Sequence, residues 1–148
     1  MTARTTIDAR RGGARYAHRI WPAHPRQLAP IRMQLRRWLE PLGITEETRE
    51  DIVLAANEAA GNSVEHAYPE ATEDDIVELI FWIEPGAVCV EIVDYGVWQT
   101  PSVERLGRGR GIPVMNHLME SVLIQHGPDR TSVLLRSAIP AGVLGPYA

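Results

Sequence analysis

The sequence predicts an α+β fold, a two-layer sandwich in which helices cover one face of a mixed, mostly antiparallel sheet. Apolar residues recur at three- and four-residue spacing in the segment 24–39, which is typical of a helix, and they alternate over 75–83, which is typical of a strand. The segments follow one another in the order β-α-α-β-β-α-β-β. Adjacent strands with helices inserted between them favour an antiparallel sheet covered on one side.

The first strand is expected over 16–21, where Pro22 ends it, and the first helix begins at His24. Pro30 falls early in this helix, where proline is tolerated. The apolar positions of the helix are Leu28, Ile31, Leu35, Trp38 and Leu39. Pro41 and Gly43 are expected to end it.

The second helix is expected to begin at Thr45 and to run to about Ala67, before Pro69. Thr45 provides a hydroxyl cap, and the acids Glu46 and Glu47 suit the positive end of the helix dipole. The packing face of this helix consists of small and apolar residues, namely Ile52, Val53, Ala56, Ala59, Ala60, Ser63, Val64 and Ala67.

The C-terminal half is expected to hold four strands and one short helix. The strands cover 75–83, 87–94, 121–125 and 131–139. The turn 84–86 joins the first two strands, and the hairpin signal 127–129 joins the last two. Between the two pairs, a loop over 95–107 and a glycine-rich patch lead into a helix over 112–120.

The 148 residues correspond to one domain, expected over 14–140, with a disordered tail over 1–13 and a loose tail over 141–148. Hydrophobic residues make up 45% of the chain and charged residues 23%, which allows a buried core. No apolar run approaches the roughly 20 residues that span a bilayer, and the N-terminus lacks the apolar region of a secretory signal. A cytoplasmic protein without a membrane partner is expected.

The use of cysteine and lysine excludes several chemistries. One cysteine, Cys89, excludes an intramolecular disulfide and a metal site built from cysteines. All 15 basic residues are arginine, so the chain has no Walker A lysine, no strand lysine of the eukaryotic-type kinases and no Schiff-base lysine. Any nucleotide phosphate is therefore bound without lysine.

Charge is distributed unevenly, although the net charge is only −4. Residues 1–37 contain nine arginines and one acid, whereas residues 38–104 contain sixteen acids and one arginine. The basic start has no interleaved aromatic residues and the chain is acidic overall, so a nucleic-acid partner is not expected. The acidic middle either faces a basic protein partner or is simply solvated.

Asp94 is the first candidate for a functional role. The alternation of the strand 87–94 places Asp94 on the same face as three apolar residues. A carboxylate on a core face requires a dedicated partner, and Gly96 permits a close approach of the backbone. The alternative is that the strand ends at Val93 and that Asp94 is a turn residue.

Glu58, Asn62 and His66 form a second candidate, because a spacing of four places them along one stripe of the second helix. Gly61 lies among their small neighbours, although glycine costs roughly 1 kcal/mol against alanine in a helix interior. A glutamate can act as a general base, and an asparagine oxygen can ligate a Mg²⁺ ion that also binds phosphate. The alternative is an ordinary polar face on an alanine-rich helix.

The glycine-rich patch and Thr131 are two weaker candidates. The patch reads Gly107-Arg108-Gly109-Arg110-Gly111 and precedes the third helix. Backbone N–H groups at a helix start bind phosphate, so the patch is either a phosphate site or a flexible, solvated loop. Thr131 begins the last strand, where its hydroxyl could hydrogen-bond a buried base or carboxylate.

Together and in this order, these features resemble the GHKL (histidine-kinase-like) ATPases, and within them the bacterial anti-sigma-factor serine/threonine kinases. The segment 57–68, NEAAGNSVEHAY, matches the N-box of that superfamily. The segments 94–96 and 107–115 match its two G-boxes, and 131–135 resembles its closing strand. The resemblance covers residues 15–138.

The resemblance implies roles for the residues on the helix stripe and in the glycine-rich patch. It implies that Glu58 is the general base, that Asn62 ligates Mg²⁺, and that His66 lines the nucleotide site. The residues that it implies on the phosphate side are Arg108, Gly109, Arg110, Gly111 and Ile112. The segment 97–106 is then a short lid over the nucleotide.

The resemblance also implies that Asp94 accepts the adenine amino group, that Gly96 lets the base lie against the backbone, and that Thr131 joins the adenine site. Two residues depart from the family pattern. Trp98 stands where many relatives have a glycine, and Arg130 stands where a glycine usually precedes the threonine. Arg130 is expected either to narrow the adenine pocket or to contact a partner.

The function implied by the resemblance is that of an anti-sigma factor with ATP- and Mg²⁺-dependent serine/threonine kinase activity. Such a protein binds a sigma factor, phosphorylates an anti-anti-sigma antagonist and forms a homodimer. The alternative is a non-catalytic module that uses ATP to order its lid and hold a partner. A sensor histidine kinase is disfavoured, because residues 1–57 leave no room for a phospho-acceptor hairpin.

Overall fold

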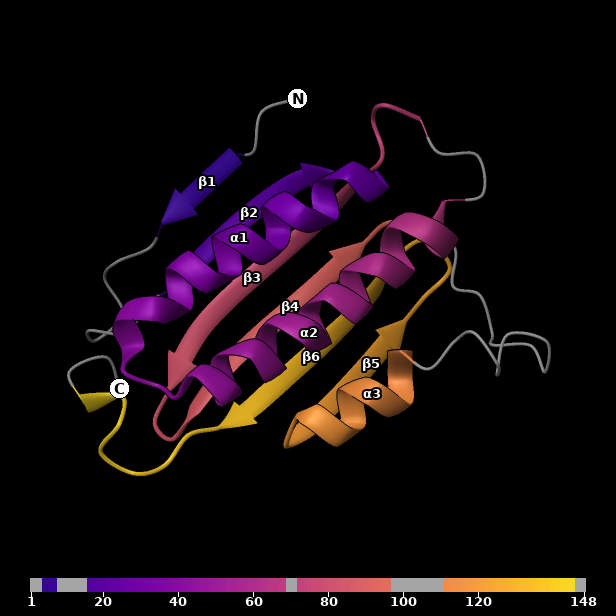
Figure 1. Cartoon of the computed structure of the whole chain (residues 1–148). Helices are drawn as coiled ribbons and strands as arrows, with labels where there is room; N and C mark the ends of the chain where they lie inside the picture. The colour runs from indigo at the N-terminus through magenta and orange to yellow at the C-terminus, as the bar shows by residue number, and fades with distance from the viewer. Residues whose placement is uncertain (1–3, 8–15, 69–71, 97–110, 146–148) are drawn as a thin grey trace.

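The computed structural model describes residues 4–7, 16–68, 72–96 and 111–145 of the chain (Figure 1). Its strands form one sheet with the order β1-β2-β3-β4-β6-β5. The strands are β1 (Arg4–Ile7), β2 (Tyr16–Pro22), β3 (Ile76–Glu84), β4 (Ala87–Asp94), β5 (Ser121–His126) and β6 (Thr131–Ala138). Every pairing between these strands is antiparallel, so the sheet is antiparallel rather than mixed over the described residues.

Three α-helices lie on the same face of the sheet, which confirms the predicted two-layer α+β architecture (Figure 1). They are α1 (Leu28–Leu39), α2 (Glu46–Asn62) and α3 (Gly111–Leu118). Short 3₁₀ turns precede and follow α1 at Pro25–Gln27 and Glu40–Leu42, and a π-helical turn over Ser63–Ala67 continues α2.

The boundaries of α2 follow from its caps. Gly43 has a φ of 76°, a left-handed conformation that glycine adopts without strain, and it ends the preceding turn. Thr45 Oγ1 then accepts a hydrogen bond from Thr48 N at 3.1 Å, as the predicted hydroxyl cap requires. Glu46 and Glu47 occupy the first turn, where acids stabilise the helix dipole.

Parts of both expected tails belong to the fold. Residues 4–7 form β1, which pairs with β2 from Arg4↔Ile20 to Ile7↔Ala17 and satisfies backbone groups that an unpaired edge strand would expose. At the other end, Leu144 is only 3% exposed and packs in the hydrophobic core. The remaining residues of the two expected tails, 1–3, 8–13 and 146–148, lie outside the described residues.

The core lies between the sheet and the helices. Val77, Leu79, Phe81 and Ile83 of β3 alternate toward the helices and are 3% exposed or less. Trp38 of α1 packs on Phe81 with ring centroids 4.5 Å apart. No helix in the described part of the chain is long and apolar enough to cross a membrane.

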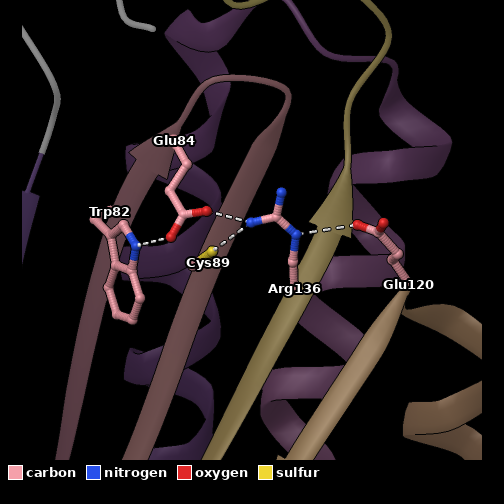
Figure 2. A network of polar contacts seen from close by, with 5 residues as sticks. All are labelled: Trp82, Glu84, Cys89, Glu120 and Arg136. Atoms are coloured by element: carbon pink, nitrogen blue, oxygen red, sulfur yellow. Dashed lines mark hydrogen bonds and ion pairs between the residues drawn. The ribbon is translucent and has the colours of Figure 1, made fainter.

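A polar network centred on Arg136 ties the strands together at the end of the sheet that carries the β3–β4 turn (Figure 2). Arg136 forms an ion pair with Glu84, and its Nε donates to Glu120 Oε2 at 3.2 Å. Trp82 Nε1 donates to Glu84 Oε1 at 3.0 Å. Arg136 Nη1 also lies 3.9 Å from the Sγ of Cys89, and burial raises the pKa of that thiol to about 11.

Candidate functional site

Asp94 is the last residue of β4 and is buried, with 4% of its surface exposed. It pairs with Val77 of β3 and with Thr131 of β6, so the strand does not end at Val93 and Asp94 is not a turn residue. Its carboxylate has two dedicated donors, as a buried charge requires. Ser63 Oγ donates to Oδ2 at 2.8 Å, and Gly96 N donates to Oδ1 at 3.1 Å.

The electrostatic state of Asp94 results from opposing effects. Burial raises the pKa of Asp94 above its ordinary value of 3.8, while the hydrogen bonds from Ser63 and Gly96 lower the pKa because they favour the charged form. An ionised carboxylate offers about four lone-pair sites, and the described donors use two of them. The carboxylate can therefore accept a further hydrogen bond from a ligand.

Thr131 lies directly opposite Asp94, at the start of β6. Its side chain is buried, and its Oγ1 has no hydrogen-bond partner among the described residues. An unsatisfied buried hydroxyl costs about 1–3 kcal/mol, so such groups call for an explanation in a folded protein. Here the unpartnered hydroxyl stands beside a carboxylate with spare acceptor capacity, which indicates a binding site for a polar ligand.

Gly96 follows Asp94 by two residues and packs against the end of the π-helical turn. A Cβ placed on Gly96 would stand 2.1 Å from the carbonyl oxygen of Ala67, a distance that no side chain tolerates. The predicted close approach of the backbone is therefore an approach to the protein's own helix end. It brings the segment after β4 against the segment that carries His66.

The stripe of Glu58, Asn62 and His66 lies along the C-terminal half of α2 and its π-helical extension. Glu58 is half-buried and Asn62 is exposed, whereas the side chain of His66 is not among those described. Arg32 Nη1 of α1 donates to Asn57 Oδ1 at 2.8 Å. Asn57 therefore faces α1, and Glu58, the next residue, projects about 100° further around the helix.

The expected phosphate-side residues are described only in part. Gly111 is the first residue of α3, and Ile112 follows it and packs against the hydrophobic core. The helix α3 packs against α2 and begins at the end of the sheet where α2 finishes (Figure 1). Arg108, Gly109 and Arg110 lie outside the described residues, as do Trp98 and the expected lid over 97–106.

Two residues contribute to the site that sequence reasoning did not assign to it. Ser63 holds the Asp94 carboxylate, and Tyr68 Oη accepts a hydrogen bond from Tyr95 N at 2.8 Å. A serine on an otherwise small and apolar packing face was a signal for Ser63, because such a hydroxyl needs a buried partner. Arg130, which departs from the family pattern, is exposed and precedes Thr131 at the start of β6, and its charge lowers the pKa of Tyr95 against the larger effect of Glu78, which raises it.

Comparison with known proteins identifies the family. Residues 21–137 match the model of the histidine kinase-like ATPase domain, which spans most of the chain. The chain belongs to this family. The resemblance carried by the N-box and G-box residues is thereby confirmed, and family membership implies an ATP-binding fold.

The relatives of this histidine kinase-like ATPase include two curated proteins. An anti-sigma F factor of Pasteuria penetrans is 28% identical over 116 residues, which cover 70% of this chain and 76% of the relative. The serine-protein kinase RsbW of Bacillus subtilis (strain 168) is 29% identical over 131 residues, which cover 78% of this chain and 81% of the relative.

A solved structure has a similar fold. It contains the RsbU and RsbW domains of Rv1364c from Mycobacterium tuberculosis and superposes with a TM-score of 0.65 at 26% sequence identity. The similarity covers 85% of this chain and 33% of that chain, so this protein spans about a third of the solved one.

Proposed function

We propose that this protein is an anti-sigma factor with Mg-ATP-dependent serine/threonine kinase activity, which binds a sigma factor and phosphorylates an anti-anti-sigma antagonist. The observation that carries the proposal is the pair formed by Asp94 and Thr131, in which a buried carboxylate with spare acceptor capacity lies opposite a hydroxyl that has no hydrogen-bond partner among the described residues. The anti-sigma F factor and the serine-protein kinase RsbW among the relatives support it.

The residues around Asp94 fit an adenine base. The Asp94 carboxylate would accept a hydrogen bond from the exocyclic amino group, and Ser63 and Gly96 hold both carboxylate oxygens in place for it. The Thr131 hydroxyl would find its missing partner in a ring nitrogen of the base. Both groups are recessed on the helix-facing side of the sheet, where water competes little with these hydrogen bonds.

The residues of the helix ends fit the phosphates and their metal ion. The Asn62 amide oxygen would ligate Mg²⁺, which prefers oxygen donors and keeps several waters and phosphate oxygens as further ligands. The N-terminus of α3 at Gly111 would present backbone N–H groups to phosphate. Arg108, Gly109, Arg110, Ile112 and His66 complete this proposed side of the site. ATP supplies the phosphoryl group when bound.

Glu58 is the proposed general base. It stands one helical turn before Asn62 on the same stripe, and it is half-buried rather than fully solvated. In this position its carboxylate would accept the proton of the serine or threonine hydroxyl that attacks the phosphorus. A base placed in this way contributes about 10²- to 10⁴-fold to the rate.

The proposed partners are a sigma factor, an anti-anti-sigma antagonist and a second copy of the chain, in the cytoplasm. Phosphorylation would add about −1.5 to −2 charge to the antagonist and so break its complex with the kinase. Light scattering tests the homodimer, because a monomer mass at working concentration would contradict it. The alternative function is a non-catalytic module that binds ATP only to hold a partner, which the presence of Glu58 disfavours.

Transfer of radiolabelled phosphate from ATP to an anti-anti-sigma protein of the same organism tests the proposed kinase. We expect transfer by the wild type, and a loss of about 10²-fold or more in Glu58→Gln with Mg-ATP binding retained. Glu73→Gln, which alters an exposed acid in the turn before β3, is the matched control and should transfer normally. Full transfer by Glu58→Gln would refute the role of Glu58, and ATP binding without transfer by the wild type would favour the non-catalytic module.

A further inference from the structure

The end of α2 contacts each residue of the segment 94–96 in turn. Ser63 Oγ donates to Asp94 Oδ2 at 2.8 Å, Tyr68 Oη accepts from Tyr95 N at 2.8 Å, and the Ala67 carbonyl packs against Gly96. The first and third contacts fall on residues of the proposed adenine site. The second falls on the residue between them, through a tyrosine that the proposed reaction does not use.

The π-helical turn explains how Ser63 and Tyr68 reach the same segment. A π-helix joins residue i to residue i+5, and Ser63 and Tyr68 are five residues apart across the turn Ser63–Ala67. Both side chains hydrogen-bond to the segment 94–96, Ser63 from the first residue of the turn and Tyr68 from the residue that ends it, where φ is −120° and ψ is 87°.

Tyr68 Oη takes the place of a sheet hydrogen bond. Val77 pairs with Asp94, so Ile76 stands opposite Tyr95, where an uninterrupted antiparallel ladder would join Tyr95 N to Ile76 O. Instead, Tyr68 Oη accepts from Tyr95 N at 2.8 Å and donates to Ile76 O at 2.6 Å. The hydroxyl thus separates β3 from the residue after β4 and directs the chain toward Ala67.

The side chain of Tyr95 is held independently, on the other face of the sheet from Asp94. Tyr95 Oη donates to Glu78 Oε1 at 2.6 Å, and Glu78 Oε2 lies 2.6 Å from His18 Nε2. These contacts fix the Tyr95 ring. Among the described residues, Tyr68 is the only hydrogen-bond partner of the Tyr95 backbone N–H. Tyr68 and the Tyr95 hydroxyl can therefore be removed separately.

From this geometry we infer that Tyr68 is a positioning residue for the nucleotide base. By holding Tyr95 N, it fixes the backbone between Asp94 and Gly96, and so aims the carboxylate and the Gly96 N–H before any ligand arrives. The inference rests on the proposed function, because it takes the ligand of Asp94 to be the base of ATP. Tyr68 itself does not touch the base.

Calorimetric titration with Mg-ATP tests the inference on the full chain. Tyr68→Phe keeps the ring and removes the hydroxyl, and we expect the Kd to rise about tenfold, which corresponds to one buried hydrogen bond. Tyr95→Phe, the matched control, should bind like the wild type. In phosphotransfer, Tyr68→Phe should raise the KM for ATP about tenfold and change kcat by less than about twofold, a split that general destabilisation does not produce.

Hydrogen exchange of the wild type gives a second test that requires neither a variant nor ATP. The Tyr95 amide should be protected without nucleotide, and exchange at the rate of an unstructured chain would overturn the inference. An unchanged Kd in Tyr68→Phe, with wild-type binding intact, would overturn it as well. Absence of Mg-ATP binding by the wild type would instead refute the proposed function.

Discussion

Gly96 lies so close to Ala67 that a Cβ on Gly96 would stand 2.1 Å from the Ala67 carbonyl oxygen. The neighbouring atom is backbone rather than the end of a flexible side chain, so it cannot give way cheaply. This contact joins Gly96, two residues after the buried carboxylate of Asp94, to the π-helical turn that continues the helix carrying Glu58 and Asn62. Together with the hydrogen bond from Ser63 to Asp94, it holds the proposed adenine and magnesium sides of the site together.

Gly96→Ala is expected to lower the free energy of unfolding by about 1–3 kcal/mol, the usual cost of forcing extra atoms into a packed region. It should also weaken Mg-ATP binding, because the backbone that donates to Asp94 must shift. Urea unfolding and calorimetry measure the two effects.

Gly61→Ala is the matched control, since a Cβ there meets nothing within 4 Å. It should raise stability by about 0.5–1 kcal/mol, and a Gly96→Ala protein as stable as wild type would contradict the contact.

Ser63→Ala is expected to raise the pKa of Asp94 further. The Ser63 hydroxyl donates to Oδ2 and favours the charged carboxylate, so its loss leaves burial opposed only by the Gly96 hydrogen bond. A pH titration followed by carboxyl ¹³C NMR measures the change. Ser132→Ala removes a buried serine on the other face of the sheet and should leave the titration of Asp94 unchanged. An unaltered pKa of Asp94 in Ser63→Ala would contradict the assignment.

The raised pKa of Asp94 also predicts how stability depends on pH. Between the ordinary value of 3.8 and the higher pKa of the folded state, the folded protein binds more protons at Asp94 than the unfolded chain does. The Asp94 contribution therefore makes the free energy of unfolding fall as pH rises through this window, and above it the loss is complete. Urea unfolding across this range measures how the free energy of unfolding changes with pH. The pH slope of the wild type should contain the Asp94 contribution, and the slope of Asp94→Asn should lack it. Identical slopes in the two proteins would contradict a raised pKa of Asp94.

Cys89 is expected to be inert toward thiol reagents in the folded protein. Burial raises its pKa to about 11, and only 2% of the residue is exposed. At pH 8 the thiolate fraction is then about a thousandth, and access is blocked as well. Reaction with a chromogenic disulfide should be at least about 100-fold slower in buffer than in urea, where the same thiol is accessible. Comparable rates in both conditions would show that the strands around Arg136 open readily.

Most of the fold was predictable because local patterns decided it. The alternation in β3, the Thr45 cap and the glycine-bearing turns fall where the sequence placed them. The strand β1 was missed, because a polar segment such as Arg4–Ile7 is recruited by the unpaired edge of β2 rather than by its own apolar pattern. The burial of Leu144 was missed for a similar reason, since it depends on tertiary packing.

Within the site, Asp94 was predictable because a carboxylate stood on an apolar face. Its donor Ser63 was not, because Ser63 lies 31 residues earlier in the chain and reaches Asp94 only through tertiary packing. The π-helical turn over Ser63–Ala67 was not predictable either, since no sequence periodicity indicates it. The contact of Gly96 with Ala67 also joins segments distant in sequence. Gly96 indicated a close approach of the backbone, but the sequence did not identify Ala67 as the residue that it approaches.

Calorimetric titration of Mg-ATP into wild type and Asp94→Asn tests the proposed adenine site at Asp94. Asn retains one acceptor, but it places an amide beside the donors Ser63 and Gly96 and removes the charge. We predict that the wild type binds and that the variant binds about 10- to 100-fold more weakly, the usual loss for a hydrogen bond to a charged group. Equal binding by both proteins, or none by the wild type, would contradict an adenine site at Asp94.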